Sequence, residues 1–450
     1  MQVIHSIVRP FHQLLGLQKI QADETYRLLA FVVELPVDEG LLLYNTMSKA
    51  MVLLSEDEVA LMNSDLRSLP QLIELWFAVP LSHDDGLLSR QMRQVAKLIR
   101  KPGKGINKYT IFTTTDCNAR CFYCYELGRP RIPMSEATAR KVADYIIGHC
   151  NGQAVGIEWF GGEPLYNKPV ITLICRLLRE SGVKYHSSMV SNAYLMDAET
   201  VEEASADWML KRVQITLDGT ERVYNRSKAY IYKDVNAYHR VLHHTELLLD
   251  KGISVNIRLN IDMHNADDLL LLADELGQRF GGRKRLTVYS HPLFGVNMEK
   301  AAVNDAETRK HVYAKQRQLM ERLRQLGLTA PVSLQRYVKS GQCMADNDRC
   351  VTILPTGHIG KCEHYSDNHF VGHIDAEGLD AEGIREFKEL HDDIDACAQC
   401  VSYPDCIRLR LCENIAKCYP EDRADKLEGI RQGMAANYQK YKQQNHEIQD

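Results

Sequence analysis

The residues Cys117-Asn118-Ala119-Arg120-Cys121-Phe122-Tyr123-Cys124 place three cysteines at C-x3-C-x2-C spacing, directly after an apolar run over residues 109–115. Three thiolates this close together on one loop can bind three irons of a [4Fe–4S] cube and leave the fourth iron without a protein ligand. A zinc knuckle would need a fourth ligand nearby, and a buried apolar cluster would not place two aromatic residues and an arginine among its thiols. The spacing therefore favours an iron–sulfur site with one open iron.

The totals indicate a globular protein with more than one domain. The chain has 450 residues, of which 45% are hydrophobic and 25% charged. A formal net charge of −4 gives no indication of nucleic acid or an anionic membrane as a partner. No apolar stretch has membrane-spanning length and the N-terminus lacks a signal-peptide pattern, so we expect a cytoplasmic protein. Eleven of its 13 cysteines fall in motifs, and in a long cytoplasmic chain such clusters more often bind metal than form disulfides.

The first hundred residues predict a small α+β domain. Three strands are expected over residues 28–35, 40–44 and 51–54. Ser55 is a suitable N-cap for a helix over residues 56–62, with Asp57 and Glu58 in its first turn, and a longer helix is expected from Asp84 or Asp85 to residue 99. Residues 101–106 are expected to form a linker.

Residues 105–325 alternate between predicted strands and amphipathic helices. The helix over residues 135–150 begins at Ser135, and its apolar stripe includes Cys150; Cys175 lies on a similar stripe, so both cysteines are expected to be packing residues. Six such units predict a parallel sheet curled into a partial barrel, whose active site lies at the carboxyl ends of the strands. The predicted strands are residues 109–115, 155–160, 184–190, 213–217, 254–259 and 285–290.

Polar or glycine-rich residues follow each of these strands. Two glycines allow the backbone to approach a ligand closely, and Glu163 offers an acceptor for an ammonium group. The stretches after strands two to six are Gly161-Gly162-Glu163-Pro164, Ser191-Asn192-Ala193, Thr216-Leu217-Asp218-Gly219-Thr220 with Arg226 beyond it, Arg258-Leu259-Asn260, and His291-Pro292-Leu293-Phe294. Their joint placement indicates one common site.

The cysteine spacing, with Tyr123 before the last cysteine, resembles the signature of the radical S-adenosylmethionine (SAM) enzymes. In that family SAM binds the fourth iron through its amine and carboxylate, and electron transfer generates a 5′-deoxyadenosyl radical. The resemblance implies that the GGEP segment holds the amine of SAM, that the fourth stretch with its arginine meets the carboxylate and ribose, and that His291 lies near the adenine. The family usually has glycine where this chain has Ala193. The implied cofactor-binding residues are Tyr123, Gly161, Gly162, Glu163, Ser191, Asn192, Thr216, Asp218 and Arg226.

Eight further cysteines follow in the C-terminal part of the chain, enough for two four-cysteine clusters. Their G-x4-C and C-x2-C-x5-C spacings resemble the SPASM domain found behind many peptide-modifying radical SAM enzymes. Five residues instead of three separate Cys406 from Cys412, so the assignment of Cys412 and Cys418 stays open, as does the alternative of two zinc sites. The implied ligands are Cys343, Cys350, Cys362 and Cys412 for an inner cluster and Cys397, Cys400, Cys406 and Cys418 for an outer one.

Glu363 directly follows Cys362, where related sulfatase-maturing enzymes have an acidic proton acceptor. The resemblance implies that Glu363 is a catalytic base. The alternative is that this carboxylate only pairs with His364 or Lys361.

As a whole the chain resembles a three-domain radical SAM/SPASM peptide maturase. The implied fold class is α/β: a partial, TIM-like (β/α)6 barrel with an N-terminal, winged-helix-like α+β peptide-recognition domain and a C-terminal cysteine-rich SPASM domain. In such recognition domains a leader peptide adds to the exposed edge of the third strand; a cap that only covers the barrel is the alternative. The expected domains are recognition, 1–104; radical SAM core, 105–325; SPASM with two auxiliary clusters, 326–420; and a polar helical tail, 421–450.

The resemblance implies an oxidoreductase with three [4Fe–4S] clusters and SAM as cofactors. A ribosomal precursor peptide is the implied substrate, and a donor such as flavodoxin or ferredoxin supplies the electron. Hydrogen abstraction followed by oxidation through the auxiliary clusters would close a thioether or carbon–carbon crosslink. Formylglycine formation in a sulfatase and peptide epimerisation are alternative reactions, and a peptide-binding iron–sulfur or zinc scaffold without turnover is the non-enzymatic alternative.

Anaerobically purified and reconstituted protein is expected to bind about twelve irons per chain, the sum of three four-iron cubes. Replacing Cys117, Cys121 and Cys124 together by alanine should remove about a third of that iron and all SAM cleavage, because the open iron is lost. Iron assays and measurement of 5′-deoxyadenosine check both expectations. Cleavage of SAM by the triple variant would refute the assignment of this loop.

Overall fold

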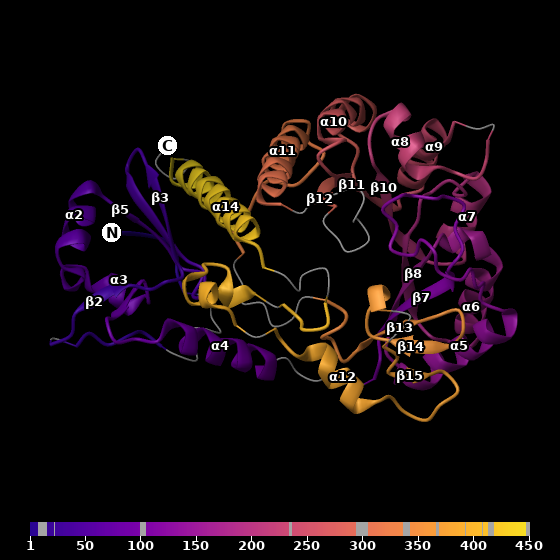
Figure 1. Cartoon of the computed structure of the whole chain (residues 1–450), viewed down its shortest axis with the longest axis horizontal. Helices are drawn as coiled ribbons and strands as arrows, with labels where there is room; N and C mark the ends of the chain where they lie inside the picture. The colour runs from indigo at the N-terminus through magenta and orange to yellow at the C-terminus, as the bar shows by residue number, and fades with distance from the viewer. Residues whose placement is uncertain are drawn as a thin grey trace. The chain divides into compact units, whose positions relative to one another are not determined.

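The computed structural model describes residues 1–7, 16–21, 23–99, 105–233, 236–293, 305–335, 343–365, 369–391, 393–406, 408–412 and 418–446. Phe294 and most of the predicted linker lie outside these residues. The chain divides into two compact units (Figure 1). The barrel unit comprises Pro102–Ala330 and Cys343–Glu389, and the terminal unit comprises Met1–Lys101, Pro331–Gln342 and Leu390–Asp450. The expected SPASM range is therefore shared between the two units, and the expected tail belongs to the same unit as the N-terminal domain.

Six parallel strands form the centre of the barrel unit, and each predicted strand is present to within three residues at either end. The sheet continues past β7, because β13 pairs with it in parallel and β14 and β15 follow antiparallel. The order across the sheet is β12-β11-β10-β9-β8-β7-β13-β14-β15 (Figure 1). The strands are β7 (Lys108–Thr114), β8 (Val155–Gly161), β9 (Tyr185–Val190), β10 (Leu210–Leu217), β11 (Ser254–Ile261), β12 (Leu286–Pro292), β13 (Cys350–Ile353), β14 (His358–Gly360) and β15 (Gly372–His373).

Helices connect these strands and bury apolar side chains against one face of the sheet. Ser135 caps α5 by accepting from the Thr138 backbone amide, as its sequence predicts. Cys150 and Cys175 are buried among apolar neighbours, which confirms their role in packing. The elements are α5 (Glu136–His149), η2 (Pro164–Asn167), α6 (Lys168–Glu180), α7 (Ala198–Ala206), α8 (Glu221–Lys228), α9 (Ala237–Asp250), α10 (Ala266–Phe280), α11 (Ala306–Gln325), η4 (Glu363–Tyr365) and α12 (Ala381–Lys388).

The terminal unit contains a four-stranded antiparallel sheet in the order β1-β5-β4-β3. The predicted strand over residues 28–35 is divided between β2 and β3. The prediction that the edge of the third strand, β5, is exposed is wrong, because β1 pairs with that edge. The elements are β1 (Gln2–His5), β2 (Tyr26–Leu28), β3 (Val32–Val37), β4 (Gly40–Asn45), β5 (Met51–Leu54), α2 (Glu56–Ser64), η1 (Leu66–Ser68), α3 (Pro70–Glu74), β6 (Ala78–Pro80), α4 (Asp85–Ile99), η5 (Asp395–Gln399), η6 (Tyr403–Asp405) and α14 (Pro420–His446).

Both faces of this sheet are covered, so all the residues of β4 after its first are buried. Leu41 and Leu43 face the core that α2, α3 and α4 help to form. Leu42 points the other way, into a second core that includes Met434 and Tyr438 of α14. The C-terminal helix is therefore an integral part of the N-terminal domain. No helix among the described residues is long and apolar enough to cross a membrane.

The segment with Cys397 and Cys400 packs on the same core as the N-terminal strands. The Tyr403 ring stacks on Phe31 with centroids 6.0 Å apart. The Thr46 hydroxyl donates to the Val401 carbonyl at 2.6 Å. Cys397 and Cys400 themselves contact this core. The proposed outer-cluster segment and the N-terminal domain therefore share one hydrophobic core.

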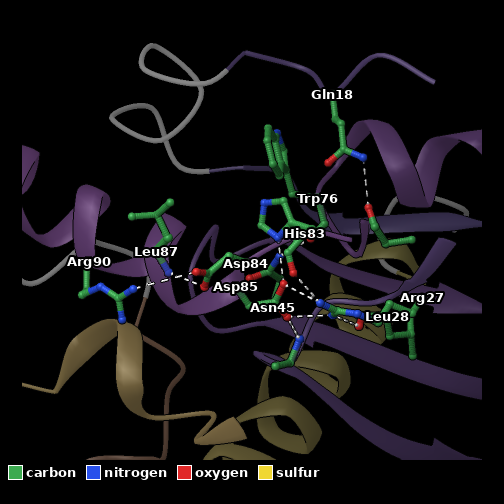
Figure 2. A network of polar contacts seen from close by, with 12 residues as sticks. Gln18, Arg27, Leu28, Asn45, Trp76, His83, Asp84, Asp85, Leu87 and Arg90 are labelled. Carbon is green, nitrogen blue, oxygen red and sulfur yellow. Dashed lines mark hydrogen bonds and ion pairs between the residues drawn. The ribbon is translucent and has the colours of Figure 1, made fainter. Parts of the chain in front are cut away.

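A buried carboxylate connects β2 to the start of α4 (Figure 2). Asp85 accepts from both terminal nitrogens of Arg27, at 2.8 and 3.0 Å, and from the Ala30 backbone amide at 2.8 Å. His83 Nδ1 lies 2.8 Å from the same carboxylate. Burial raises the pKa of Asp85, but the hydrogen bonds from His83 and Arg27 outweigh it and hold the pKa below its usual value.

Replacing Met434 by alanine is expected to lower the free energy of unfolding of the terminal unit by about 2–5 kcal/mol, because the side chain is fully buried and its removal leaves a cavity. Gln439→Ala, on the exposed side of the same helix, is the matched control and should change it by less than about 0.5 kcal/mol. Denaturant unfolding followed by circular dichroism measures both variants. Equal effects of the two substitutions would contradict the packing of α14.

Candidate active site

The three cysteines of the opening motif lie on the loop that follows β7, at the carboxyl end of the strand. All three are free of disulfides and partly exposed. Burial raises the pKa of Cys117 to about 12 and that of Cys124 to about 11, and the charge of Glu163 adds to the rise at Cys117. A thiolate here needs positive charge, which iron supplies. No three His, Cys, Asp or Glu side chains of the described residues could share a single metal ion, whereas a four-iron cube spreads its thiolates over separate irons.

Two glycines allow the loop after β8 to lie against this cysteine loop. A Cβ on Gly161, whose φ is +125°, would lie 2.1 Å from the Thr114 carbonyl oxygen, and one on Gly162 would lie 2.3 Å from that of Asp116. The Gly162 amide donates to the Thr114 carbonyl (3.0 Å) and the Glu163 amide to that of Asp116 (2.9 Å). Only glycine fits at both positions, because any side chain would overlap the backbone.

Glu163 connects the loops after β8 and β9. Its fully buried carboxylate accepts from the Ser191 hydroxyl (2.8 Å), the Asn192 amide (2.8 Å) and the Leu165 amide (3.2 Å). Burial raises the pKa of Glu163 to about 7, although these hydrogen bonds oppose the rise. The Asn192 side chain in turn donates to Asn118 Oδ1 at 2.7 Å, within the cysteine loop. The structure therefore brings Glu163, Ser191 and Asn192 together beside the cysteines.

Ala193 adopts the left-handed conformation that the family pattern assigns to glycine. Its φ is +59°, and its carbonyl oxygen lies 2.8 Å from His244 Nδ1 on α9. An alanine in this region costs roughly 1–2 kcal/mol relative to the right-handed region. The turn after β9 is thus as tight as a glycine turn, and the surrounding structure sustains the strain.

Tyr123, Asp218 and Lys228 form a buried polar group below the cysteine loop. Tyr123 donates to Asp218 Oδ2 at 2.6 Å, and Lys228 Nζ lies 2.8 Å from the phenol oxygen and 3.0 Å from the same carboxylate oxygen. Burial lowers the pKa of Lys228, but the charge of Asp218, together with those of nearby tyrosines and Cys121, outweighs it and raises the pKa well above its usual value. The Lys228 carbonyl also accepts from the Arg120 amide at 2.8 Å, which anchors the cysteine loop to α8.

The sequence did not point to Lys228, since a lysine on a helix is usually exposed. Arg226, two residues earlier on α8, is exposed, so the structure does not bring it to the other predicted residues. Thr216 lies on the barrel-lining face of β10, beside Arg258 of β11 in the register. The polar residues on this face predicted a site nearby, because they follow one another at the carboxyl end of the sheet. Sequence periodicity does not show which of these side chains contact one another.

A polar chain runs from the barrel lining to the cysteine loop. Arg258 Nε donates to Asn260 Oδ1 (2.9 Å), and Asn260 Nδ2 donates to Asp218 Oδ1 (3.1 Å). Asp218 then continues to Tyr123. His291, on β12, is the partner of Asn260 in the parallel register. Residues of strands four and five therefore form one network with the cysteine loop, and His291 lies beside it on β12.

Glu363 and His364 lie in the turn after β14. The His364 ring is 4.7 Å from that of Tyr125, which directly follows Cys124. Glu363 Oε2 is buried without a hydrogen-bond partner among the described residues. Lys361 donates to the Asn347 and Cys350 carbonyls, both at 2.6 Å, so its ammonium group is committed to the backbone rather than to Glu363.

The cysteines of the expected auxiliary clusters belong to both units. Cys343, Cys350 and Cys362 are in the barrel unit, and the other five are in the terminal unit. Burial raises the pKa of Cys400, and the charges of Cys418 and Cys397 raise it further. Arg423 Nη1 lies 3.4 Å from Cys418 Sγ. Cys418 therefore lies near Cys397 and Cys400, which supports its assignment to the outer set.

Residues 111–276 match the family model of the radical SAM superfamily. The chain therefore contains a radical SAM domain, and its α/β fold with a parallel sheet is the radical SAM fold. It is 29% identical over 129 residues to GTP 3′,8-cyclase of Erythrobacter litoralis, covering 28% of this chain and 38% of that protein. It is 24% identical over 279 residues to the probable GTP 3′,8-cyclase of Halobacterium salinarum, covering 58% and 74%. The chain thus spans about two fifths of the length of the Erythrobacter protein.

Two solved structures have a similar fold at low sequence identity. Native anSMEcpe with bound AdoMet and Kp18Cys peptide has a TM-score of 0.57 and 15% identity, covering 75% of this chain and 99% of that one. Streptococcus suis SuiB bound to precursor peptide SuiA has a TM-score of 0.50 and 12% identity, covering 85% and 95%. At these identities the two structures establish the fold.

Lys228→Met should destabilise the barrel unit by about 3–5 kcal/mol, because it leaves the buried Asp218 carboxylate without its cation. Adding Asp218→Asn should recover part of that loss, since the unpaired charge is removed. Arg222→Met, on the exposed side of the same helix, is the matched control and should have little effect. Thermal and denaturant unfolding measure the series, and a double variant no more stable than Lys228→Met alone would contradict the ion-pair interpretation.

Proposed function

We propose that this protein is a radical SAM enzyme that modifies a ribosomally made precursor peptide. The observation that carries the proposal is the close packing of the Gly161-Gly162-Glu163 loop after β8 against the backbone that leads into the loop with three free cysteines, inside a domain of the radical SAM superfamily. When bound, a [4Fe–4S] cluster and SAM supply a 5′-deoxyadenosyl radical that removes hydrogen from the substrate.

The residues present fit this cofactor pair. Cys117, Cys121 and Cys124 would hold three irons, and Glu163 would accept the methionyl ammonium beside them. A positive partner at Glu163 compensates the burial that otherwise raises the pKa of this carboxylate to about 7. Thr216 offers a hydroxyl on the barrel lining for the remaining polar groups of SAM. Asp218 would have to exchange one of its contacts with Tyr123, Lys228 or Asn260 to bind SAM directly. Arg226 would need a change of side-chain position to contribute, because it is exposed on α8.

The chain's contribution to the reaction is positioning and exclusion of water. The tight contacts among the loops after β7, β8 and β9 hold the cysteine loop and Glu163 in one geometry. Apolar side chains close the opposite face of the sheet. A reactive radical formed here is directed to one hydrogen rather than to solvent.

Two observations support a peptide as the substrate. The two solved structures of similar fold that contain peptides extend over most of this chain. The terminal unit contributes an additional sheet and helices outside the radical SAM domain, as expected for a separate recognition module. Its β5 edge is occupied by β1, so a leader peptide would bind the outer edge of β1 or β3, or displace β1.

The auxiliary cysteines would hold two further clusters that accept the electron of the substrate radical. In the terminal unit, Cys397 borders an open cavity of about 880 Å³ that is also lined by Arg27, Arg90 and Tyr403. A cluster held by Cys397 would thus lie close to solvent, where a redox protein such as flavodoxin or ferredoxin can exchange electrons with it. Sites of the zinc type would bind metal equally well but would not transfer electrons.

A thioether or carbon–carbon crosslink is the proposed product, with Glu363 as the proton acceptor. The buried Oε2 atom of this carboxylate, which makes no hydrogen bond among the described residues, supports a functional role over a purely structural one. Formylglycine formation and epimerisation are the competing reactions. Mass spectrometry of a co-expressed precursor peptide separates them, since a crosslink removes two hydrogens per bond whereas epimerisation leaves the mass unchanged.

The experiment that tests the function is anaerobic incubation of reconstituted protein with SAM and dithionite, with and without a precursor peptide encoded beside its gene. Formation of 5′-deoxyadenosine together with a mass change in the peptide supports the proposal. Protein with full iron content that forms no 5′-deoxyadenosine would instead be a scaffold.

Glu363→Gln retains the size of the side chain but removes the base, so hydrogen abstraction should continue while product formation falls by about 10²–10⁴-fold. The measurement is the ratio of 5′-deoxyadenosine to modified peptide. Iron content is the control for damage near Cys362. An unchanged ratio and rate would remove Glu363 from the mechanism.

A further inference from the structure

Arg258 lies on the barrel-lining face of β11, because the apolar residues that alternate with it are buried on the opposite face. Its neighbours in the parallel register are Thr216 on β10 and Tyr289 on β12. Among the described residues, Nε donates to Asn260 Oδ1 at 2.9 Å. Within the described part of the chain, the two terminal guanidinium nitrogens make neither a hydrogen bond nor an ion pair. The barrel therefore presents a cation whose paired donors are available to a ligand.

Two histidine rings lie within reach of the charge of this guanidinium. Burial lowers the pKa of His291 to about 4, and the charge of Arg258 lowers it further. The charge of Arg258 also acts on the ring of His364, which directly follows Glu363 in the turn after β14. Arg258 thus lies close enough to both rings to act on them, and hence near Glu363. Arg258 is thus part of the network that reaches the cysteine loop, and its charge acts on the residue next to the proposed proton acceptor.

In the order of the sheet, Arg258 is several strands away from Glu163, the residue expected to bind the ammonium group of SAM. Glu163 follows β8, and β9 and β10 lie between β8 and β11. Neighbouring strands are about 4.8 Å apart, so β8 and β11 are separated by roughly 14 Å along the sheet. The ammonium and carboxylate groups of SAM share one carbon atom. A SAM whose ammonium group is bound at Glu163 therefore has its carboxylate beside the loops after β8 and β9, nearer to those strands than to β11.

We propose that Arg258 is a specificity-determining residue that binds a carboxylate of the peptide substrate, either an acidic side chain near the attacked residue or the C-terminal carboxylate. This inference rests on the proposed function and adds the substrate class, an acidic peptide. A planar guanidinium with two free nitrogens matches the two oxygens of a carboxylate. One such ion pair orients the peptide in the barrel so that one residue faces the radical source and Glu363.

Three synthetic pentapeptides test the proposal on the full-length, reconstituted protein with SAM bound. Ac-Ala-Ala-Glu-Ala-Ala-amide carries a side-chain carboxylate, Ac-Ala-Ala-Gln-Ala-Ala with a free C-terminus carries a terminal one, and Ac-Ala-Ala-Gln-Ala-Ala-amide carries none. NMR titration should show that the wild-type protein binds one of the two acids about 10–100-fold more tightly than the neutral peptide. The preferred acid identifies the source of the carboxylate.

Arg258→Gln should abolish this preference while changing the affinity for SAM by less than about threefold. Arg283→Gln removes a surface arginine that pairs with Asp250 outside the barrel lining, and it should keep the preference. If Arg258→Gln does not fold, Arg258→Lys takes its place, because lysine keeps the positive charge but lacks the paired donors of a guanidinium. A reduced preference for the acidic peptide in this variant supports the proposal, and an unchanged preference overturns it.

Two further results overturn the proposal. One is equal affinity of the wild-type protein for all three peptides. The other is a loss of SAM affinity of tenfold or more in Arg258→Gln, which would assign the guanidinium to SAM. Release of 5′-deoxyadenosine is measured in the same preparation. Absence of 5′-deoxyadenosine would refute the proposed function. The peptide affinities do not depend on turnover, so they test the role of Arg258 in either case.

Discussion

The close approach of two loops is the constraint on which the rest of the site depends. The loop after β8 passes so near the cysteine loop that no side chain fits at Gly161 or Gly162. This contact brings Glu163 beside Cys117, and the hydrogen bonds of Glu163 then fix the loop after β9. The loops after β7, β8 and β9 are thereby held in fixed positions relative to one another. A metal cluster and a small cofactor need such fixed loops, because their ligands must keep their relative positions during turnover.

A buried ion pair stabilises the part of the site formed by β10 and α8. Asp218 is buried in the barrel, and its charge is balanced by Lys228 rather than by solvent. Removing either partner alone would leave the other charge uncompensated, so the pair is expected to act as a single element. Because Lys228 also accepts a backbone hydrogen bond from the cysteine loop, the ion pair and the loop conformation stabilise each other.

In the terminal unit, one sheet organises both ends of the chain. Its faces are covered by helices from the N-terminal part on one side and by α14 on the other. The segment with Cys397 and Cys400 belongs to the first of these cores. A cluster bound by that segment would therefore stabilise the N-terminal domain, and deletion of that domain would expose the core on which the segment packs.

The sequence by itself determined the features that depend on neighbouring residues. Alternating or continuous apolar runs located all six barrel strands, Ser55 and Ser135 marked helix starts that the structure confirms, and the spacing of Cys117, Cys121 and Cys124 indicated the chemistry. These signals are readable because strand periodicity, capping and ligand spacing all act over a few residues.

Only the tertiary structure decided which distant segments meet. The pairing of β1 with β5, the extension of the barrel sheet by β13, and the packing of Met434 on the terminal sheet join segments far apart in sequence. The same holds for the two cations of α8, since Lys228 is buried and Arg226 exposed although they are two residues apart. Their difference arises from the position of Asp218 in space, and no local pattern encodes that position.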